Sequence, residues 1–188
     1  MPGTPRLKSR CRAAAVAIPL LLALLFAGCG SSTQAADSTK TTKPLPAGLY
    51  PSAVSKMVCR SEASHDVGLA LGETAAVTTP TWTDHVYTCN YDYQSGSMTL
   101  SVKELSSWPE TLAYFHGLGS QLGVARTLAN LGQGAFQTSD GSVVVRKDWK
   151  VLLVDSSQLP PQFGNPPTTS GDIAVTVADV ILGCWAGD

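Results

Sequence analysis

Residues 85–105, HVYTCNYDYQSGSMTLSVKEL, carry the clearest local pattern in the chain and decide the fold that we expect. Val86–Tyr93 and Ser97–Leu105 both alternate between apolar and polar side chains, as β-strands with one buried face do. The dipeptide Ser95-Gly96 between them suits a two-residue hairpin turn. The sequence therefore predicts an antiparallel β-hairpin in this segment.

The position of the turn sets the register of this hairpin. A turn at 95–96 makes paired positions sum to 191, and every pair on one face is then apolar or aromatic. These pairs are Tyr93 with Met98, Tyr91 with Leu100 and Cys89 with Val102. The other face carries polar pairs such as Asn90 with Ser101. We expect the first face to belong to the core and the second to face water.

Three further segments have the apolar spacing of amphipathic helices. The first is Ser61–Leu71, after which Gly72 is the expected left-handed residue that ends a helix. The second, residues 107–122, begins with the capping-box pattern Ser-x-x-Glu. The third is Asp172–Leu182, near the end of the chain.

The segment Leu131–Asp155 predicts a meander of further antiparallel strands. Asp140-Gly141 is a hairpin-turn signal, and Val143–Val154 is rich in β-branched residues and apolar on both faces, as central strands are. Residues 78–83 and 158–170 contain prolines and predict loops. The expected fold is therefore α+β: an antiparallel sheet, made of the hairpin and the meander, with helices packed mainly on one face.

The N-terminus has the organisation of an export signal. A basic segment precedes an apolar run of 15 residues, Ala13–Ala27, which is short for a membrane span of about 20 residues. The run leads into Leu25–Cys29, LFAGC, which resembles a lipobox, where small residues precede a cysteine that receives lipid. We therefore expect residues 1–28 to be a cleaved lipoprotein signal peptide. Lipid on Cys29 then anchors the protein on the outer face of the cytoplasmic membrane.

Two segments of different character follow the leader. Residues 29–48 are expected to form a flexible tether, because they have almost no large apolar side chains to offset the ordering entropy. Residues 49–188 remain as a single domain, long enough for a hydrophobic core. This domain has seven basic and thirteen acidic side chains, a net charge of −6. Such a balance argues against nucleic acid as a partner and against electrostatic docking on anionic lipid.

No catalytic, cofactor or metal motif stands out in the domain. His65, His85 and His116 lack the spacing of a zinc site, which needs three or four converging ligands. Ser120 lacks the strand and turn that would present a serine nucleophile. The Gly-rich segments, one of them at 117–119, do not match a nucleotide-binding fingerprint. We therefore expect no cofactor, no metal and no enzymatic activity.

The aromatic side chains of the domain can be interpreted in two ways: they line a ligand cleft, or they pack in the core. The tyrosines at alternate positions of the hairpin, including Tyr91 and Tyr93, fit core packing better. Trp149 lies between Asp148 and Lys150 at the end of an expected strand, so it is the best candidate for an exposed aromatic contact.

Several segments together resemble a known class of secreted domain. In chain order they are Met57-Val58-Cys59, Tyr87-Thr88-Cys89-Asn90-Tyr91, Leu131–Phe136 (LGQGAF), Val143–Val154 and a final helix rich in Ala and Val. Over residues 49–188 they resemble actinobacterial cell-envelope lipoproteins of unknown function with a small secreted α+β domain. They are also distantly similar to the extracellular sensor domains of mycobacterial receptor kinases. The resemblance implies an envelope-exposed binding or accessory domain, no enzyme activity, and a cystine that joins the first helix to a strand.

Three cysteines remain in the domain, Cys59, Cys89 and Cys184, and export makes one disulfide the expectation. Cys89 belongs to the apolar face of the hairpin, and Cys59 directly precedes a helix that must pack on that face. Together with the resemblance, this favours a Cys59–Cys89 disulfide and leaves Cys184 as a thiol. The alternative pairing is Cys59 with Cys184, if the first and last helices are neighbours.

These observations predict a non-enzymatic lipoprotein, held to the membrane through Cys29, that binds a small ligand or another envelope protein. The alternatives are a hydrolase that acts on a cell-wall component and an accessory subunit with a structural role. A pocket lined by polar groups as well as aromatics is the observation that favours ligand binding.

Overall fold

The computed structural model describes residues 43–185. The expected leader, the expected lipid attachment at Cys29 and residues 30–42 of the expected tether lie outside the described residues. None of the helices in the described part of the chain is both long and apolar enough to cross a membrane.

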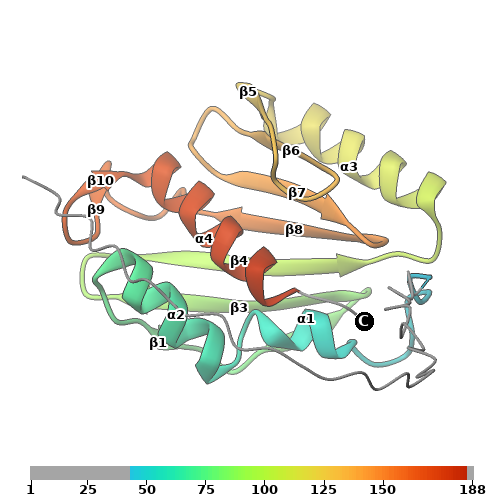
Figure 1. Ribbon diagram of the computed structural model, residues 1–188, viewed down its shortest axis with the longest axis horizontal. Coiled ribbons are helices and arrows are strands. Elements are labelled where there is room, and N and C mark those ends of the chain that lie inside the picture. Colours follow the sequence, from blue (N-terminus) through green and yellow to red (C-terminus); the bar gives the residue numbers. More distant parts are fainter. Residues whose placement is uncertain (1–42, 186–188) are drawn as a thin grey trace, which may run out of the picture. The chain divides into compact units, whose positions relative to one another are not determined.

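The domain is α+β and is built on an eight-stranded antiparallel sheet, as expected (Figure 1). The strand order is β1-β3-β4-β8-β7-β6-β5, and β2 also pairs with β3. The strands are β1 (Ala76–Val77), β2 (Thr81–Thr83), β3 (Val86–Tyr93), β4 (Gly96–Glu104), β5 (Arg126–Leu128), β6 (Gly134–Gln137), β7 (Val143–Lys147) and β8 (Lys150–Asp155). Both β7 and β8 have a neighbour on each side, as their apolar character on both faces predicts.

Helices cover both faces of this sheet, but most of them lie on one face (Figure 1). The helices are α1 (Ala53–Met57), α2 (Ser61–Leu71), α3 (Trp108–Leu122) and α4 (Ser170–Cys184). The core that contains α1, α2 and α4 also contains Val143 and Val145 of β7. Val144, which points the other way, packs with Phe115 of α3. Alternate residues of β7 therefore serve two separate cores.

The predicted register of the β3–β4 hairpin is wrong by two residues. The turn lies at 94–95, so Tyr91 is opposite Met98 and Cys89 is opposite Leu100. A shift of two residues leaves every side chain on its predicted face. Tyr91, Met98 and Leu100 are accordingly fully buried, while Asn90 on the other face is exposed.

A long-range contact explains why Gly96 is not in the turn. Gly96 belongs to β4, where a side chain would come within 2.5 Å of the carbonyl oxygen of Gln158. The neighbouring Ser97 N–H donates to that same oxygen at 3.3 Å. The glycine therefore permits the close approach of a distant loop, which no local pattern reveals.

The structure contains the expected disulfide between Cys59 and Cys89, with 5.9 Å between their Cα atoms. It joins the segment that leads into α2 to the buried face of β3. Beside it the Tyr91 hydroxyl donates to the Val58 carbonyl oxygen at 2.6 Å. The covalent bond and the hydrogen bond together hold the α1–α2 connection on the hairpin.

Cys184 is a free thiol at the end of α4. Helices α2 and α4 lie side by side, as the alternative pairing requires, but the Cys184 Sγ lies 3.8 Å from the Asp66 carboxylate instead of near Cys59. Burial and the neighbouring Asp66 raise the pKa of this thiol.

Most of the remaining differences between the predicted and the observed secondary structure concern short helices and strands. The expected loop at 78–83 contains β2, and that at 158–170 contains a small hairpin of β9 (Gln162–Phe163) and β10 (Thr168–Thr169). Helix α1 and strands β1 and β5 were not predicted either. Each of these elements has two to five residues, too few for a periodic pattern to show.

Candidate ligand-binding site

A cavity of about 560 Å³ lies between α3 and the part of the sheet formed by β5, β6 and β7. Its size falls within the usual range of small-molecule sites, roughly 300–1,000 Å³. The residues that line it are Phe115, His116, Gly119, Ser120, Val124, Thr127, Gly134, Ala135, Phe136 and Arg146. Aromatic and aliphatic side chains thus form most of the wall, with a few polar groups among them.

The start of α3 sets the position of the helical wall. The Ser107 hydroxyl accepts a hydrogen bond from the Glu110 N–H, and the Glu110 carboxylate accepts one from the Ser106 N–H at 2.9 Å. The Ser107 contact is the predicted N-cap, whereas the Glu110 carboxylate binds the N–H one residue before the position that a capping box predicts. Trp108 and Phe115 are then two turns apart on one face of α3, the face that meets the sheet.

Arg146 is the most distinctive residue of the cavity. Its guanidinium carbon lies 4.6 Å from the centroid of the Trp108 ring and 5.6 Å from that of Phe115. Its Nη1 atom is buried and has no hydrogen-bond partner. No carboxylate of residues 43–185 forms an ion pair with it. The cavity therefore holds a positive charge that only aromatic faces balance.

Backbone alternation and a glycine place this side chain in the cavity. Arg146 follows Val144 by two positions on β7, so both point to the α3 side of the sheet. Gly134, its partner across the β6–β7 ladder, has no side chain, and a Cβ there would come 2.7 Å from the Arg146 Nε. The absence of a side chain at Gly134 therefore leaves the space that the Arg146 guanidinium occupies.

His116 and Ser120 lie one turn apart on the helical wall, but they do not form a nucleophile and base pair. The Ser120 hydroxyl donates to the backbone carbonyl oxygen of His116 at 3.1 Å. No acidic side chain is among the residues that line the cavity. A serine hydrolase holds its serine hydroxyl against a histidine ring that a carboxylate orients, and the described residues of this wall do not show that set of contacts.

The three histidines lie in different elements: His65 in α2, His116 in α3 and His85 between β2 and β3. His65 lines a separate groove at the end of α2, and His85 packs edge-on against Trp82. Across residues 43–185, no group of three or more His, Cys, Asp and Glu side chains could hold a metal ion.

A second cavity, of about 430 Å³, lies where residues 45–53 cross the end of the sheet. Its floor contains two charged residues that are almost fully buried, Glu104 and Lys150. The Glu104 carboxylate accepts hydrogen bonds from the Ser52 N–H, at 2.7 Å, and from the Ser55 hydroxyl. These contacts fix the start of α1 on β4, so the carboxylate has a structural role.

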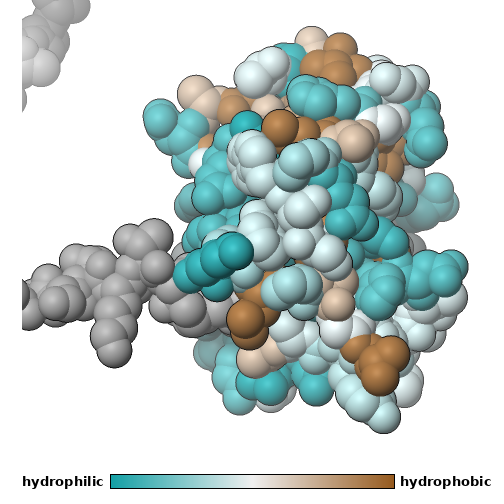
Figure 2. All heavy atoms as spheres, turned by 90° about the vertical axis from the view of Figure 1, so that its right-hand side faces the viewer, coloured by the Kyte–Doolittle hydropathy of each residue, from teal (hydrophilic) through white to brown (hydrophobic). Residues whose placement is uncertain are grey.

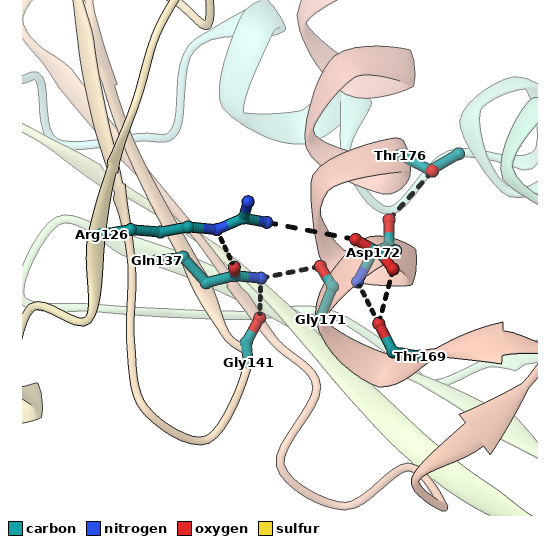
Figure 3. A network of polar contacts seen from close by, with 7 residues as sticks. All are labelled: Arg126, Gln137, Gly141, Thr169, Gly171, Asp172 and Thr176. Carbon is teal, nitrogen blue, oxygen red and sulfur yellow. Dashed lines mark hydrogen bonds and ion pairs between the residues drawn. The ribbon is translucent and has the colours of Figure 1, made fainter.

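A polar network joins the start of α4 to β5 and β6 (Figure 3). The buried Gln137 side chain donates to the carbonyl oxygens of Gly141 and Gly171 at 2.9 and 2.8 Å. Its own oxygen accepts from the Arg126 Nε at 2.7 Å, and Arg126 also reaches Asp172 at 4.0 Å. Figure 3 shows that these polar groups bind one another through hydrogen bonds and one ion pair. The network therefore attaches the start of α4 to the sheet.

Aromatic residues divide between the core and the cavity. Tyr91 and Trp185 are buried in the main core, as core packing predicts for the tyrosine. Trp149, the expected exposed contact, is only partly exposed and lies under the Lys43 ammonium at 5.7 Å. Trp108 lies beside the cavity, through its contact with Arg146.

The surface seen in Figure 2 has no broad apolar patch. Hydrophobic residues form small separate groups among polar residues on that face. Wide apolar surfaces are the usual mark of a protein-docking site.

Comparisons of the chain with protein-family models, curated proteins and solved structures give no match. The site is therefore defined by its own geometry. It is a largely apolar cavity lined by the Arg146 guanidinium, whose Nη1 has no hydrogen-bond acceptor. Sequence reasoning missed Arg146, Phe115 and Phe136 as site residues. The available signal was an arginine directly after three valines, Val143-Val144-Val145-Arg146, in a segment that continues with a second cation, Lys147.

Proposed function

We propose that this chain is a membrane-anchored envelope lipoprotein whose domain binds a small, largely apolar ligand in the cavity beneath α3. The observation that carries the proposal is the cavity itself, with aromatic walls and a small number of polar groups. Sites of this composition bind small molecules by burying most of the ligand surface and fixing its orientation through the polar groups. The proposed role involves no bond-making chemistry.

The anchor belongs to the same proposal and rests on the sequence. The apolar run and the small residues before Cys29 support lipid attachment there, on the outer face of the cytoplasmic membrane. The resemblance to actinobacterial envelope lipoproteins supports the same location. In this arrangement the cavity faces the extracytoplasmic space.

Two glycines of α3 give a direct test of the binding site. A Cβ on Gly119 would lie 3.2 Å from a methyl of Val124 and 3.7 Å from the Phe136 ring, so Gly119→Leu fills the cavity. Val124 is exposed and has room to shift. A Cβ on Gly117, in the same helix, would meet nothing within 4 Å, so Gly117→Leu is the matched control.

The experiment is native mass spectrometry of the lipoprotein extracted from its own membranes. We expect a small-molecule adduct on the wild type and on Gly117→Leu, and its loss from Gly119→Leu. Circular dichroism of each variant checks that the fold is kept. A wild type without any adduct, or an adduct that Gly119→Leu retains, would contradict the proposed function.

A further inference from the structure

We infer that the ligand is an amphipathic monocarboxylate, whose carboxylate binds Arg146 and whose apolar body fills the remainder of the cavity. The inference rests on the proposed function, because it requires that a small molecule occupies this site. It goes beyond that function by assigning the ligand its charge, its charged group and the residue that recognises it.

The state of Arg146 argues for an anion. A guanidinium is always protonated in proteins, and it has five N–H donors in one plane. Trp108 and Phe115 contact it at 4.6 and 5.6 Å, which satisfies part of its charge but accepts no hydrogen bond from it. The buried Nη1 has no acceptor at all. Among residues 43–185 the guanidinium has no hydrogen-bond acceptor, and it lines the cavity, so an acceptor supplied by a ligand meets N–H donors that are not already engaged.

The geometry favours a carboxylate over other anions. Aromatic contacts with a guanidinium engage its flat face and leave the N–H donors at its edge free. A carboxylate matches two such donors at once, in a planar arrangement. Among residues 43–185, Arg146 is the one Lys or Arg side chain that lines the cavity, so this part of the chain balances a single negative charge there. A phosphate monoester brings close to two charges at neutral pH and is less well matched.

The rest of the cavity favours an apolar body on that carboxylate. The Phe115 and Phe136 rings lie 5.0 Å apart, edge to face, and Val124 adds an aliphatic side. Gly119 contributes no side chain and widens the space beside Phe136. No carboxylate lines the wall to repel the ligand.

The test compares ligands that share one shape and differ in charge. Isothermal titration of the mature lipoprotein in nonionic detergent uses 2-naphthoate, its neutral analogue 2-naphthamide and the dianion 2-naphthyl phosphate. A titration of protein-free detergent is subtracted each time. We expect 2-naphthoate to bind the wild type at least about tenfold more tightly than either of the others, because a charge-assisted bidentate pair is made only with it.

Variants then assign the preference to Arg146. Arg146→Gln is expected to bind the acid and the amide with equal affinity, and Arg146→Lys to keep part of the preference. Arg126→Gln, which changes an exposed arginine outside the cavity, is expected to keep all of it. If Arg146→Gln does not fold, the wild-type and Arg146→Lys titrations decide the question.

The inference is overturned if the wild type binds the amide as tightly as the acid, if it prefers the phosphate, or if Arg146→Gln retains the preference. Those results leave the proposed function intact when the adduct lost from Gly119→Leu has been observed. Absence of that adduct contradicts the proposed function instead, so the two failures are distinct.

Discussion

Replacing Gln137 by Leu should loosen the joint between α4 and the sheet. Gln137 is only 7% exposed and uses its whole amide: two donor contacts to backbone carbonyls and one acceptor contact from Arg126. Leu has a similar size and makes none of these bonds. The Gly141 and Gly171 carbonyl oxygens then lose their donor at positions that are half-buried.

The magnitude follows from these three contacts. Each neutral hydrogen bond contributes about 1 kcal/mol net, and the bond from charged Arg126 about 1.5–3 kcal/mol when well shielded. Arg126 is 57% exposed, so its share belongs at the low end of that range. Burial of the Leu side chain offsets part of the loss. We expect Gln137→Leu to lower the free energy of unfolding by about 2–3 kcal/mol.

Urea unfolding followed by circular dichroism measures this change, and hydrogen exchange locates it. Exchange should accelerate in the first turn of α4, residues 170–175, before it does so in β3 and β4. Thr176→Ala is the matched control, because the exposed Thr176 hydroxyl donates only to a carbonyl within α4. It should cost less than about 0.5 kcal/mol. A Gln137→Leu variant as stable as the control would refute this reasoning.

Three further predictions concern stability, the disulfide and the anchor. Burial raises the pKa of Tyr91 and Tyr93 above the ordinary tyrosine value, so the folded state keeps these protons longer than the unfolded chain. The contribution of these two tyrosines to the free energy of unfolding should therefore be constant below about pH 10 and fall above it, so that the decline above pH 10 is less steep in Tyr91→Phe, as urea titrations at each pH will show. Reduction of Cys59–Cys89, which spans 30 residues, should cost about 3–4 kcal/mol, and an unchanged urea midpoint in dithiothreitol would contradict this. Cys29→Ala should abolish lipidation and maturation. Intact-mass analysis of the wild type should show a diacylglyceryl group on Cys29. A mature protein with an unmodified Cys29 would exclude the anchor.

In the β3–β4 hairpin, the local sequence pattern predicts which face of each strand is buried but not the register of the pairing. Alternation placed Cys89, Tyr91 and Leu100 on the buried face correctly, because the period of a strand is two residues and the core accepts only one face. The same alternation is satisfied by any register that differs by two. In the register that the structure adopts, Gly96 lies in β4, where a side chain would clash with the Gln158 carbonyl oxygen, and local alternation does not reveal this approach.

The candidate site was less predictable than the fold. Its parts come from α3, β5, β6 and β7, which pair or pack only after the sheet has formed. Arg146 and Lys147 stand side by side at the end of β7, and nothing in the local sequence shows which of the two faces the cavity. Gly134, 12 positions before Arg146, provides its space only because the two residues are opposite each other in the ladder.

The apolar and polar faces of the strands and the start of α3 follow from short-range patterns in the sequence. The sequence together with the resemblance favoured Cys59–Cys89 over Cys59–Cys184, and the tertiary structure contains the favoured disulfide. Tertiary structure alone decided the hairpin register, the passage of α3 to the opposite face from α2 and α4, and the enclosure of Arg146 between aromatic rings. The reason is that periodicity and capping act over a few residues. The choice of which surfaces meet depends on packing free energy summed over the whole chain.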